Sequence, residues 1–308
     1  MKTLWIMLLA FTLLTGAEQK QPALSMYTYK QLTAIEALIQ KQQLKAAGEK
    51  LRAMLDDLPE SAVDRAYIFN TAGMYYLQSE NYKEATRMLR RAYDEHTLSE
   101  AQILPTAELI GNLYMHSGQY TDAAEFYEAY LKMAPEPKMS VVRSCAVAYY
   151  QQQRYADAAA LLEKQKGRFT PDENLYRILF ASYYALKQHQ KALKTADEMV
   201  KHWNGKREYW LQLSSLYYET GKRAEALSAI ELAYYRGVLE KESDYMRYIY
   251  LLVEMQIPYK AAELLERFIA EKKVSDSEGH LKLLEQCRIY ARETAPRHED
   301  RSDTMEAE

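Results

Sequence analysis

Cysteine, glycine and proline are scarce in this chain of 308 residues, and charge of one sign does not dominate it. Two cysteines cannot build a disulfide framework or a structural zinc site. Ten glycines and eight prolines are few turn formers for this length, which disfavours a β-sheet protein with its many tight turns. The 40 basic and 43 acidic residues leave a formal net charge of −3. A chain so close to neutral has no overall electrostatic reason to bind nucleic acid or anionic lipid.

The sequence also lacks the usual signatures of catalysis and of cofactor binding. Its six histidines do not pair at the spacing of a metal-binding motif, and no HExxH motif occurs. The glycines are scattered singly, so the sequence contains no phosphate-binding loop. Acidic pairs such as Asp56-Asp57 fall near expected helix ends, where solvation explains them. We therefore expect a protein that is not an enzyme and that uses no metal and no cofactor.

A long apolar run stands at the start of the sequence. Residues 1–17 read MKTLWIMLLAFTLLTGA, in which Lys2 precedes an apolar stretch from Leu4 to Leu14 and small residues follow. This order predicts a secretory signal peptide that is cleaved near Ala17. The alternative is a retained membrane anchor, but a spanning helix needs about 20 apolar residues. We expect a periplasmic protein with a net charge of −4 and no integral membrane span after cleavage.

Self-similarity is the most informative feature of the sequence. Seven alanines recur at steps of 34 to 38 residues: Ala47, Ala85, Ala123, Ala158, Ala192, Ala226 and Ala261. Nine residues before five of these alanines stands a tyrosine: Tyr76, Tyr114, Tyr149, Tyr183 and Tyr217. Leu38 and Leu252 take that place in the outer units, and small residues such as Gly73 and Gly111 stand three places earlier. This alternation of bulky and small residues predicts closely packed antiparallel helices, joined by short polar turns such as Ser117-Gly118-Gln119. No stretch alternates with the period of a β-strand.

The pattern resembles the tetratricopeptide repeat, a helix–turn–helix unit of 34 residues. The best unit runs Trp210-x2-Leu213-Ser214-x2-Tyr217 and continues with Ala226 and Ile230. The resemblance covers about residues 28–275 and implies an all-α, right-handed solenoid of about seven units. A further amphipathic helix over residues 277–292 is expected to cap its C-terminal end.

The predicted organisation follows from these patterns. It comprises a signal peptide over 1–17, an N-terminal linker over 18–27, a solenoid over 28–292 and a disordered charged tail over 293–308. Cys145 falls on the first helix of an inner unit, whereas Cys287 falls on the capping helix. Units this distant should keep their Cα atoms too far apart for a disulfide, so we expect two buried thiols.

In tetratricopeptide repeat proteins, the first helix of each unit lines a groove that binds other proteins. Transferring the groove positions to this chain yields six candidate residues: Asn112, Arg143, Tyr150, Arg177, Tyr184 and Tyr218. Tyrosine and arginine are frequent binding anchors because they combine a large contact area with hydrogen bonding. The alternative, that these tyrosines merely pack against a neighbouring helix, stays open from the sequence.

Residues 209–265 carry a narrower similarity. The runs Trp210-Leu211-Gln212-Leu213, Arg236-Gly237-Val238-Leu239 and Gln256-Ile257-Pro258 resemble exported tetratricopeptide repeat proteins associated with TonB-type energy-transducing systems of Gram-negative bacteria. This resemblance implies an accessory scaffold that contacts the transducer or its inner-membrane motor. Two alternatives remain open. One is an envelope-assembly or cell-wall-associated scaffold, and the other is a glycan-binding helical domain that stacks sugars on tyrosine rings.

Overall fold

The computed structural model describes residues 23–167 and 171–294, and these residues form fifteen α-helices and no strand. The predicted signal peptide and residues 295–308 of the predicted tail lie outside the described residues. Helix α1 begins at Met26, two residues before the predicted start of the solenoid, and α15 continues to Thr294. The all-α fold class expected from the repeat is confirmed for the described part of the chain.

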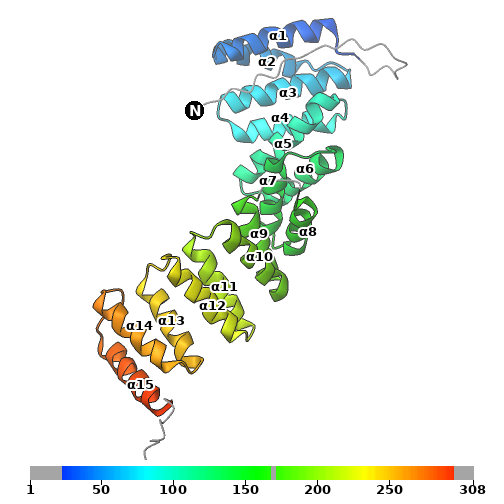
Figure 1. The fold of residues 1–308 in the computed structure, drawn as a ribbon. Coiled ribbons are helices and arrows are strands. Elements are labelled where there is room, and N and C mark those ends of the chain that lie inside the picture. The colour runs from blue at the N-terminus through cyan, green and yellow to red at the C-terminus, as the bar shows by residue number, and fades with distance from the viewer. Residues whose placement is uncertain (1–22, 168–170, 295–308) are drawn as a thin grey trace, which may run out of the picture. The chain divides into compact units, whose positions relative to one another are not determined.

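The helices form seven consecutive hairpins followed by α15 (Figure 1). The hairpins are α1 (Met26–Gln40) with α2 (Leu44–Asp56), α3 (Ala62–Gln78) with α4 (Tyr82–Asp94), α5 (Glu100–His116) with α6 (Tyr120–Met133), α7 (Met139–Gln151) with α8 (Tyr155–Gln165), α9 (Glu173–Ala185) with α10 (His189–His202), α11 (Arg207–Glu219) with α12 (Arg223–Tyr235), and α13 (Glu242–Glu254) with α14 (Pro258–Ala270). Helix α15 spans Glu278–Thr294 and packs against α14. The seven predicted helix–turn–helix repeats and the capping helix are thus confirmed.

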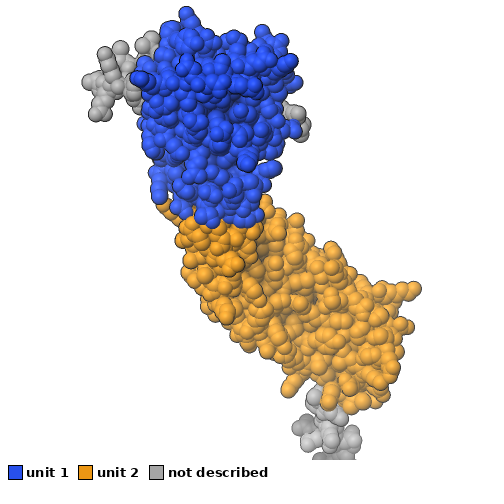
Figure 2. All heavy atoms as spheres, turned by 180° about the vertical axis from the view of Figure 1, so that it is seen from behind, with its two compact units in different colours: residues 1–141 blue, residues 142–308 orange. Residues whose placement is uncertain are grey.

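The chain divides into two compact units, residues 1–141 and residues 142–308 (Figure 2). The first unit contains α1 to α6, the second contains α8 to α15, and the division falls within α7. In both units, helices that follow one another in the chain pack together. This nearest-neighbour packing is typical of repeat proteins.

The repeated alanines lie at the contact between the two helices of each hairpin. All seven are fully buried, with exposed fractions of 0%. The small residues of the partner helix also pack as predicted: the Ser214 hydroxyl donates to the Ala226 carbonyl at 2.9 Å. At Gly111, an added Cβ atom would lie 2.6 Å from the Tyr127 ring. Small side chains at these positions therefore allow the close approach of the two helices.

All seven hairpin turns have the same backbone geometry. Each contains one residue with positive φ: Gln42, Glu80, Gly118, Gln153, Lys187, Gly221 and Gln256. Only two of these seven residues are glycines. The N–H of the next residue donates to a carbonyl near the end of the first helix, at 2.9 Å in every hairpin. The accepting carbonyls belong to the tyrosines of the repeat and to Leu38 and Leu252. This is a Schellman cap, so the repeated residue marks where the first helix ends.

The two cysteines lie in the second unit. Cys145 in α7 and Cys287 in α15 are both buried and are not joined by a disulfide. The prediction of two buried thiols is confirmed.

Candidate functional site

The six predicted groove residues lie on the first helices of four hairpins. Asn112 is on α5, in the first unit. The other five lie in the second unit: Arg143 and Tyr150 on α7, Arg177 and Tyr184 on α9, and Tyr218 on α11.

Three of the six make contacts that support the fold. The Asn112 side-chain oxygen accepts a 2.7 Å hydrogen bond from the hydroxyl of the buried Tyr127. Arg143 forms an ion pair with Asp172, which also caps α9 by accepting two backbone N–H groups. The Tyr150 ring packs edge-on against Tyr155, with ring centroids 5.1 Å apart. These contacts are structural, and a binding role for the three residues stays a prediction.

The second unit presents three exposed tyrosines on successive first helices. Tyr184 on α9, Tyr218 on α11 and Tyr250 on α13 are 45%, 41% and 55% exposed. The Tyr184 ring stacks on Phe180, and its hydroxyl lies 3.3 Å from both carboxylate oxygens of Glu219 on α11. These contacts hold the Tyr184 ring in place while half of its surface remains in water.

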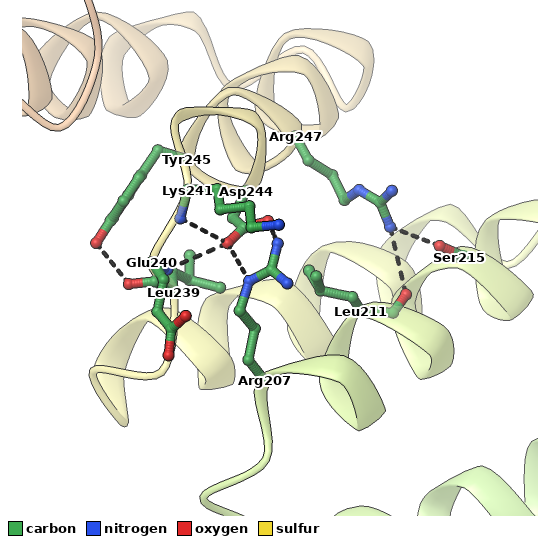
Figure 3. A network of polar contacts seen from close by, with 9 residues as sticks. All are labelled: Arg207, Leu211, Ser215, Leu239, Glu240, Lys241, Asp244, Tyr245 and Arg247. Atoms are coloured by element: carbon green, nitrogen blue, oxygen red, sulfur yellow. Dashed lines mark hydrogen bonds and ion pairs between the residues drawn. The ribbon is translucent and has the colours of Figure 1, made fainter. Parts of the chain in front are cut away.

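Arginines accompany these tyrosines. The Arg223 guanidinium lies 3.7 Å from the centre of the Tyr218 ring and pairs with Glu254 at 2.6 Å. Arg247 on α13 reaches back to α11, where its Nη1 donates to the Ser215 hydroxyl at 2.5 Å and to the Leu211 carbonyl at 3.3 Å (Figure 3). Both of these acceptors are uncharged.

Neither Arg177 nor Arg247 forms an ion pair with a carboxylate of the described residues, and both are exposed. A guanidinium in this situation can bind a carboxylate from outside with two parallel hydrogen bonds. We call Arg177, Tyr184, Tyr218, Arg247 and Tyr250 together the tyrosine face.

A buried ion pair fixes α11 relative to α13. The Asp244 carboxylate is 3% exposed and receives Nε of Arg207 at 2.5 Å and a second guanidinium N–H (Figure 3). The same carboxylate accepts the backbone N–H groups of Lys241 at 2.9 Å and Glu240 at 3.1 Å. Burial alone would raise the pKa of Asp244, but the hydrogen bonds from Arg207 and from these two amides lower it. The carboxylate therefore stays charged and holds the two helices that carry Tyr218 and Tyr250.

Electrostatics also define the state of Tyr184. The negative charge of Glu219, followed by its hydrogen bond, raises the pKa of the Tyr184 phenol above the ordinary value of 10.0. The phenol is therefore a hydrogen-bond donor at neutral pH.

Two members of the tyrosine face were not among the predicted residues. Continuing the repeat register by one hairpin places Tyr250 on α13 at the position that Ser215 holds on α11. The repeat pattern of the sequence therefore did indicate Tyr250. No such signal exists for Arg247, because the register points to its neighbour Met246, which is buried. A long side chain that reaches across to the next helix does not follow the register.

Within 23–167 and 171–294, no three His, Cys, Asp or Glu side chains gather closely enough to hold a metal ion. In the same ranges, none of the helices has the length and apolar character needed to cross a bilayer.

Stacked helical hairpins with short, uniform turns define an α-helical repeat protein. Two family models described as tetratricopeptide repeat match the chain, one over residues 70–137 and the other over residues 114–179. The hairpins within residues 70–179 therefore match tetratricopeptide repeats. No curated protein matches the chain.

The chain is similar to several solved structures. The C-terminal part of a repeat protein from Cytophaga hutchinsonii is 16% identical, with a TM-score of 0.53, over 82% of this chain and 99% of that one. A chain of the Naa15/Naa10 complex bound to HypK-THB is 16% identical with a TM-score of 0.58, over 86% of this chain and 39% of that one. A tetratricopeptide repeat protein from Parabacteroides merdae is 17% identical with a TM-score of 0.45, over 86% of this chain and 100% of that one.

Proposed function

We propose that the chain is a non-enzymatic protein–protein interaction scaffold that binds a partner through the tyrosine face. The observation that carries the proposal is the set of exposed tyrosines on α9, α11 and α13, together with the exposed Arg177 on α9 and Arg247 on α13, whose guanidinium groups lack a carboxylate partner among the described residues. Tyrosine and arginine are enriched among the few residues that contribute most of the binding free energy of protein interfaces. The complementary partner is a protein segment that carries carboxylates next to apolar side chains.

The proposed location is the periplasm, and the proposed partner is a component of a TonB-type transport system. The order of residues in the N-terminal 17-residue stretch supports export. The similarity over residues 209–265 supports the transport role, and this region includes Tyr218, Arg247 and Tyr250 of the tyrosine face. An envelope-assembly or cell-wall scaffold is the competing role.

Photo-crosslinking in living cells tests both the face and the partner. A photoreactive amino acid replaces Tyr184, and the adducts are identified by mass spectrometry. The same amino acid at Tyr27, which is 71% exposed on α1, serves as the control. Adducts with a transducer or motor subunit at position 184 only are the expected result. Cell-wall or assembly proteins would move the proposal to the competing role, and identical adducts at both positions would contradict the binding face.

A double variant separates binding from folding. Arg177→Glu with Tyr184→Ala should leave helicity and the melting temperature almost unchanged, because both side chains are exposed. The affinity for the partner that crosslinking identified should fall by at least about tenfold, since both anchors are lost. The matched control is Arg52→Glu with Tyr27→Ala, two exposed residues of the first unit. A large loss of stability in the first pair only would show that Arg177 and Tyr184 support the fold instead.

A further inference from the structure

A second candidate site lies in the second unit between α12 and α14, which are the second helices of their hairpins. An open hollow of about 640 Å³ separates them. Its lining residues are Tyr234, Tyr235, Tyr259, Lys260, Glu263, Leu264, Arg267 and Lys273. No member of the tyrosine face lines it, so this site is independent of the function proposed above.

Aromatic rings line much of the hollow. Tyr235 and Tyr259 are 68% and 73% exposed, among the most exposed large hydrophobic side chains of the described residues. Tyr234 is half-buried and packs against Phe268 and Tyr248, with ring centroids 5.4 Å and 5.7 Å away. The hollow therefore combines one anchored ring with two rings that are largely exposed to water, one of which, Tyr235, also contacts Tyr234 at a centroid distance of 5.5 Å.

The cationic residues of the hollow are each neutralised by a neighbouring carboxylate. Lys260 pairs with Glu231, Arg267 pairs with Glu263 at 2.8 Å, and Lys273 pairs with Glu271 at 2.6 Å.

The pair at Lys260 is part of a larger network. Glu231 also accepts a 3.0 Å hydrogen bond from the Tyr248 hydroxyl. Burial raises the pKa of Glu231, but the hydrogen bonds from Lys260, Tyr248 and Tyr235 lower it, so the carboxylate is charged.

These charges restrict the chemistry of a ligand. An ionic ligand would find no unpaired charge among the lining cations and would have to break an existing pair. A purely apolar ligand would remove water from three ion pairs without replacing its hydrogen bonds, which is unfavourable. A flat protein surface would cover the hollow without filling it. The remaining class is a neutral, hydrogen-bonding ligand with apolar faces that can stack on tyrosine rings.

We propose that the hollow between α12 and α14 binds a neutral oligosaccharide. The C–H faces of the sugar rings would stack on Tyr235 and Tyr259. The sugar hydroxyls would bond to the remaining donors and acceptors of the Lys260 and Arg267 pairs. These two residues are seven positions apart on α14, or about 10 Å along the helix. That length suits a chain of sugar rings better than a single ring.

The test is a titration of the full chain with three neutral trisaccharides: tri-N-acetylchitotriose, maltotriose and cellotriose. Isothermal calorimetry should detect binding of at least one of them below about 10 mM. Tyr259→Ala and Tyr235→Ala should each weaken that binding by about tenfold, because each removes one stacking ring. Tyr259→Phe keeps the ring and should change the affinity by less than about threefold.

The matched control is Tyr27→Ala, which removes a tyrosine of similar exposure from the first unit. It should leave the affinity for the sugar unchanged. Circular dichroism establishes that each variant is folded. Three results would overturn the proposal: no heat with any of the three sugars, equal loss in the control, or loss of protein crosslinks instead of sugar binding in Tyr259→Ala.

Discussion

At the scale of single residues, Gly111 shows how tightly each hairpin is packed. A Cβ atom added at this glycine would lie 2.6 Å from a ring atom of Tyr127. The Tyr127 ring is fully buried, and its hydroxyl donates a hydrogen bond to Asn112. Gly111→Ala should therefore overpack the hairpin at a cost of about 1–3 kcal/mol, offset in part by the better helix propensity of alanine. We expect a net loss of unfolding free energy, measured by urea denaturation.

Gly48 supplies the control for this prediction. A Cβ atom there would meet the Tyr75 hydroxyl at 2.4 Å, but this is the far end of a half-buried side chain that can turn away. Gly48→Ala should be neutral or should stabilise by up to about 1 kcal/mol through helix propensity. Equal destabilisation by both variants would contradict the explanation that the buried Tyr127 ring, unlike the Tyr75 hydroxyl, cannot move aside.

The titration of Tyr184 is a second prediction at this scale. Because the Glu219 charge disfavours the phenolate, the pKa of Tyr184 lies above 10.0. Glu219→Gln removes that charge, so the pKa should fall toward the ordinary value. NMR of chains with carbon-13-labelled tyrosine measures this titration. The control is Glu254→Gln on α13, which should leave the pKa of Tyr184 unchanged. An equal fall of this pKa in the control would show that the contact with Glu219 does not cause the shift.

At the scale of helices, Asp244 determines how α13 is held against α11. Asp244→Ala would leave the Arg207 guanidinium, whose side chain is 20% exposed, without its partner and would remove the cap of α13. We expect a loss of about 3 kcal/mol in urea unfolding. The control is Glu254→Ala at the more exposed Arg223–Glu254 pair, which should cost less than about 1 kcal/mol.

The same pair makes a predicted contribution to acid stability. The pKa of Asp244 is below its ordinary value of 3.8 in the folded chain. The contribution of this carboxylate to the unfolding free energy is therefore complete above about pH 3.8. It is lost as the pH falls through the lower pKa of the folded chain. Asp244→Asn should show a weaker dependence of unfolding free energy on pH in this acidic range. An unchanged slope would show that Asp244 is not a source of the acid sensitivity.

Much of the helical architecture was predictable because one packing rule recurs. The buried alanines, the small residues opposite them and the carbonyls that close each turn all follow the repeat register. The left-handed residues of the turns were less predictable. Only Gly118 and Gly221 carry the usual glycine, whereas Gln153 and Lys187 adopt the same conformation without it. The Schellman hydrogen bonds impose this backbone geometry whichever residue stands there.

At the scale of the whole molecule, the residues of the two proposed binding surfaces were only partly predictable. The register located Tyr184 and Tyr218, because surface positions on a helix recur with the repeat. The register missed Arg247, whose side chain crosses from α13 to α11. It also missed the hollow between α12 and α14, which depends on ion pairs between these helices such as Lys260–Glu231. Contacts between neighbouring repeats depend on side-chain length and direction, which a periodic pattern does not encode.

The cysteines report how this repeat array opens. In a linear array the terminal elements have fewer neighbours and open at lower free energy than internal ones. Cys287 lies on α15, which packs against α14 at the end of the described hairpins, whereas Cys145 lies on α7 with hairpins on both sides in the chain. Burial also raises the pKa of the Cys287 thiol and keeps it unreactive while α15 is docked.

We therefore expect neither thiol to react with an alkylating reagent in native buffer. As urea is added below the main unfolding transition, Cys287 should be modified first, and Cys145 should follow only with global unfolding. Pulsed alkylation with mass spectrometry distinguishes the two sites. Earlier modification of Cys145 would contradict fraying from α15 and would show instead that the array opens at α7, the helix that contains the division between the two units.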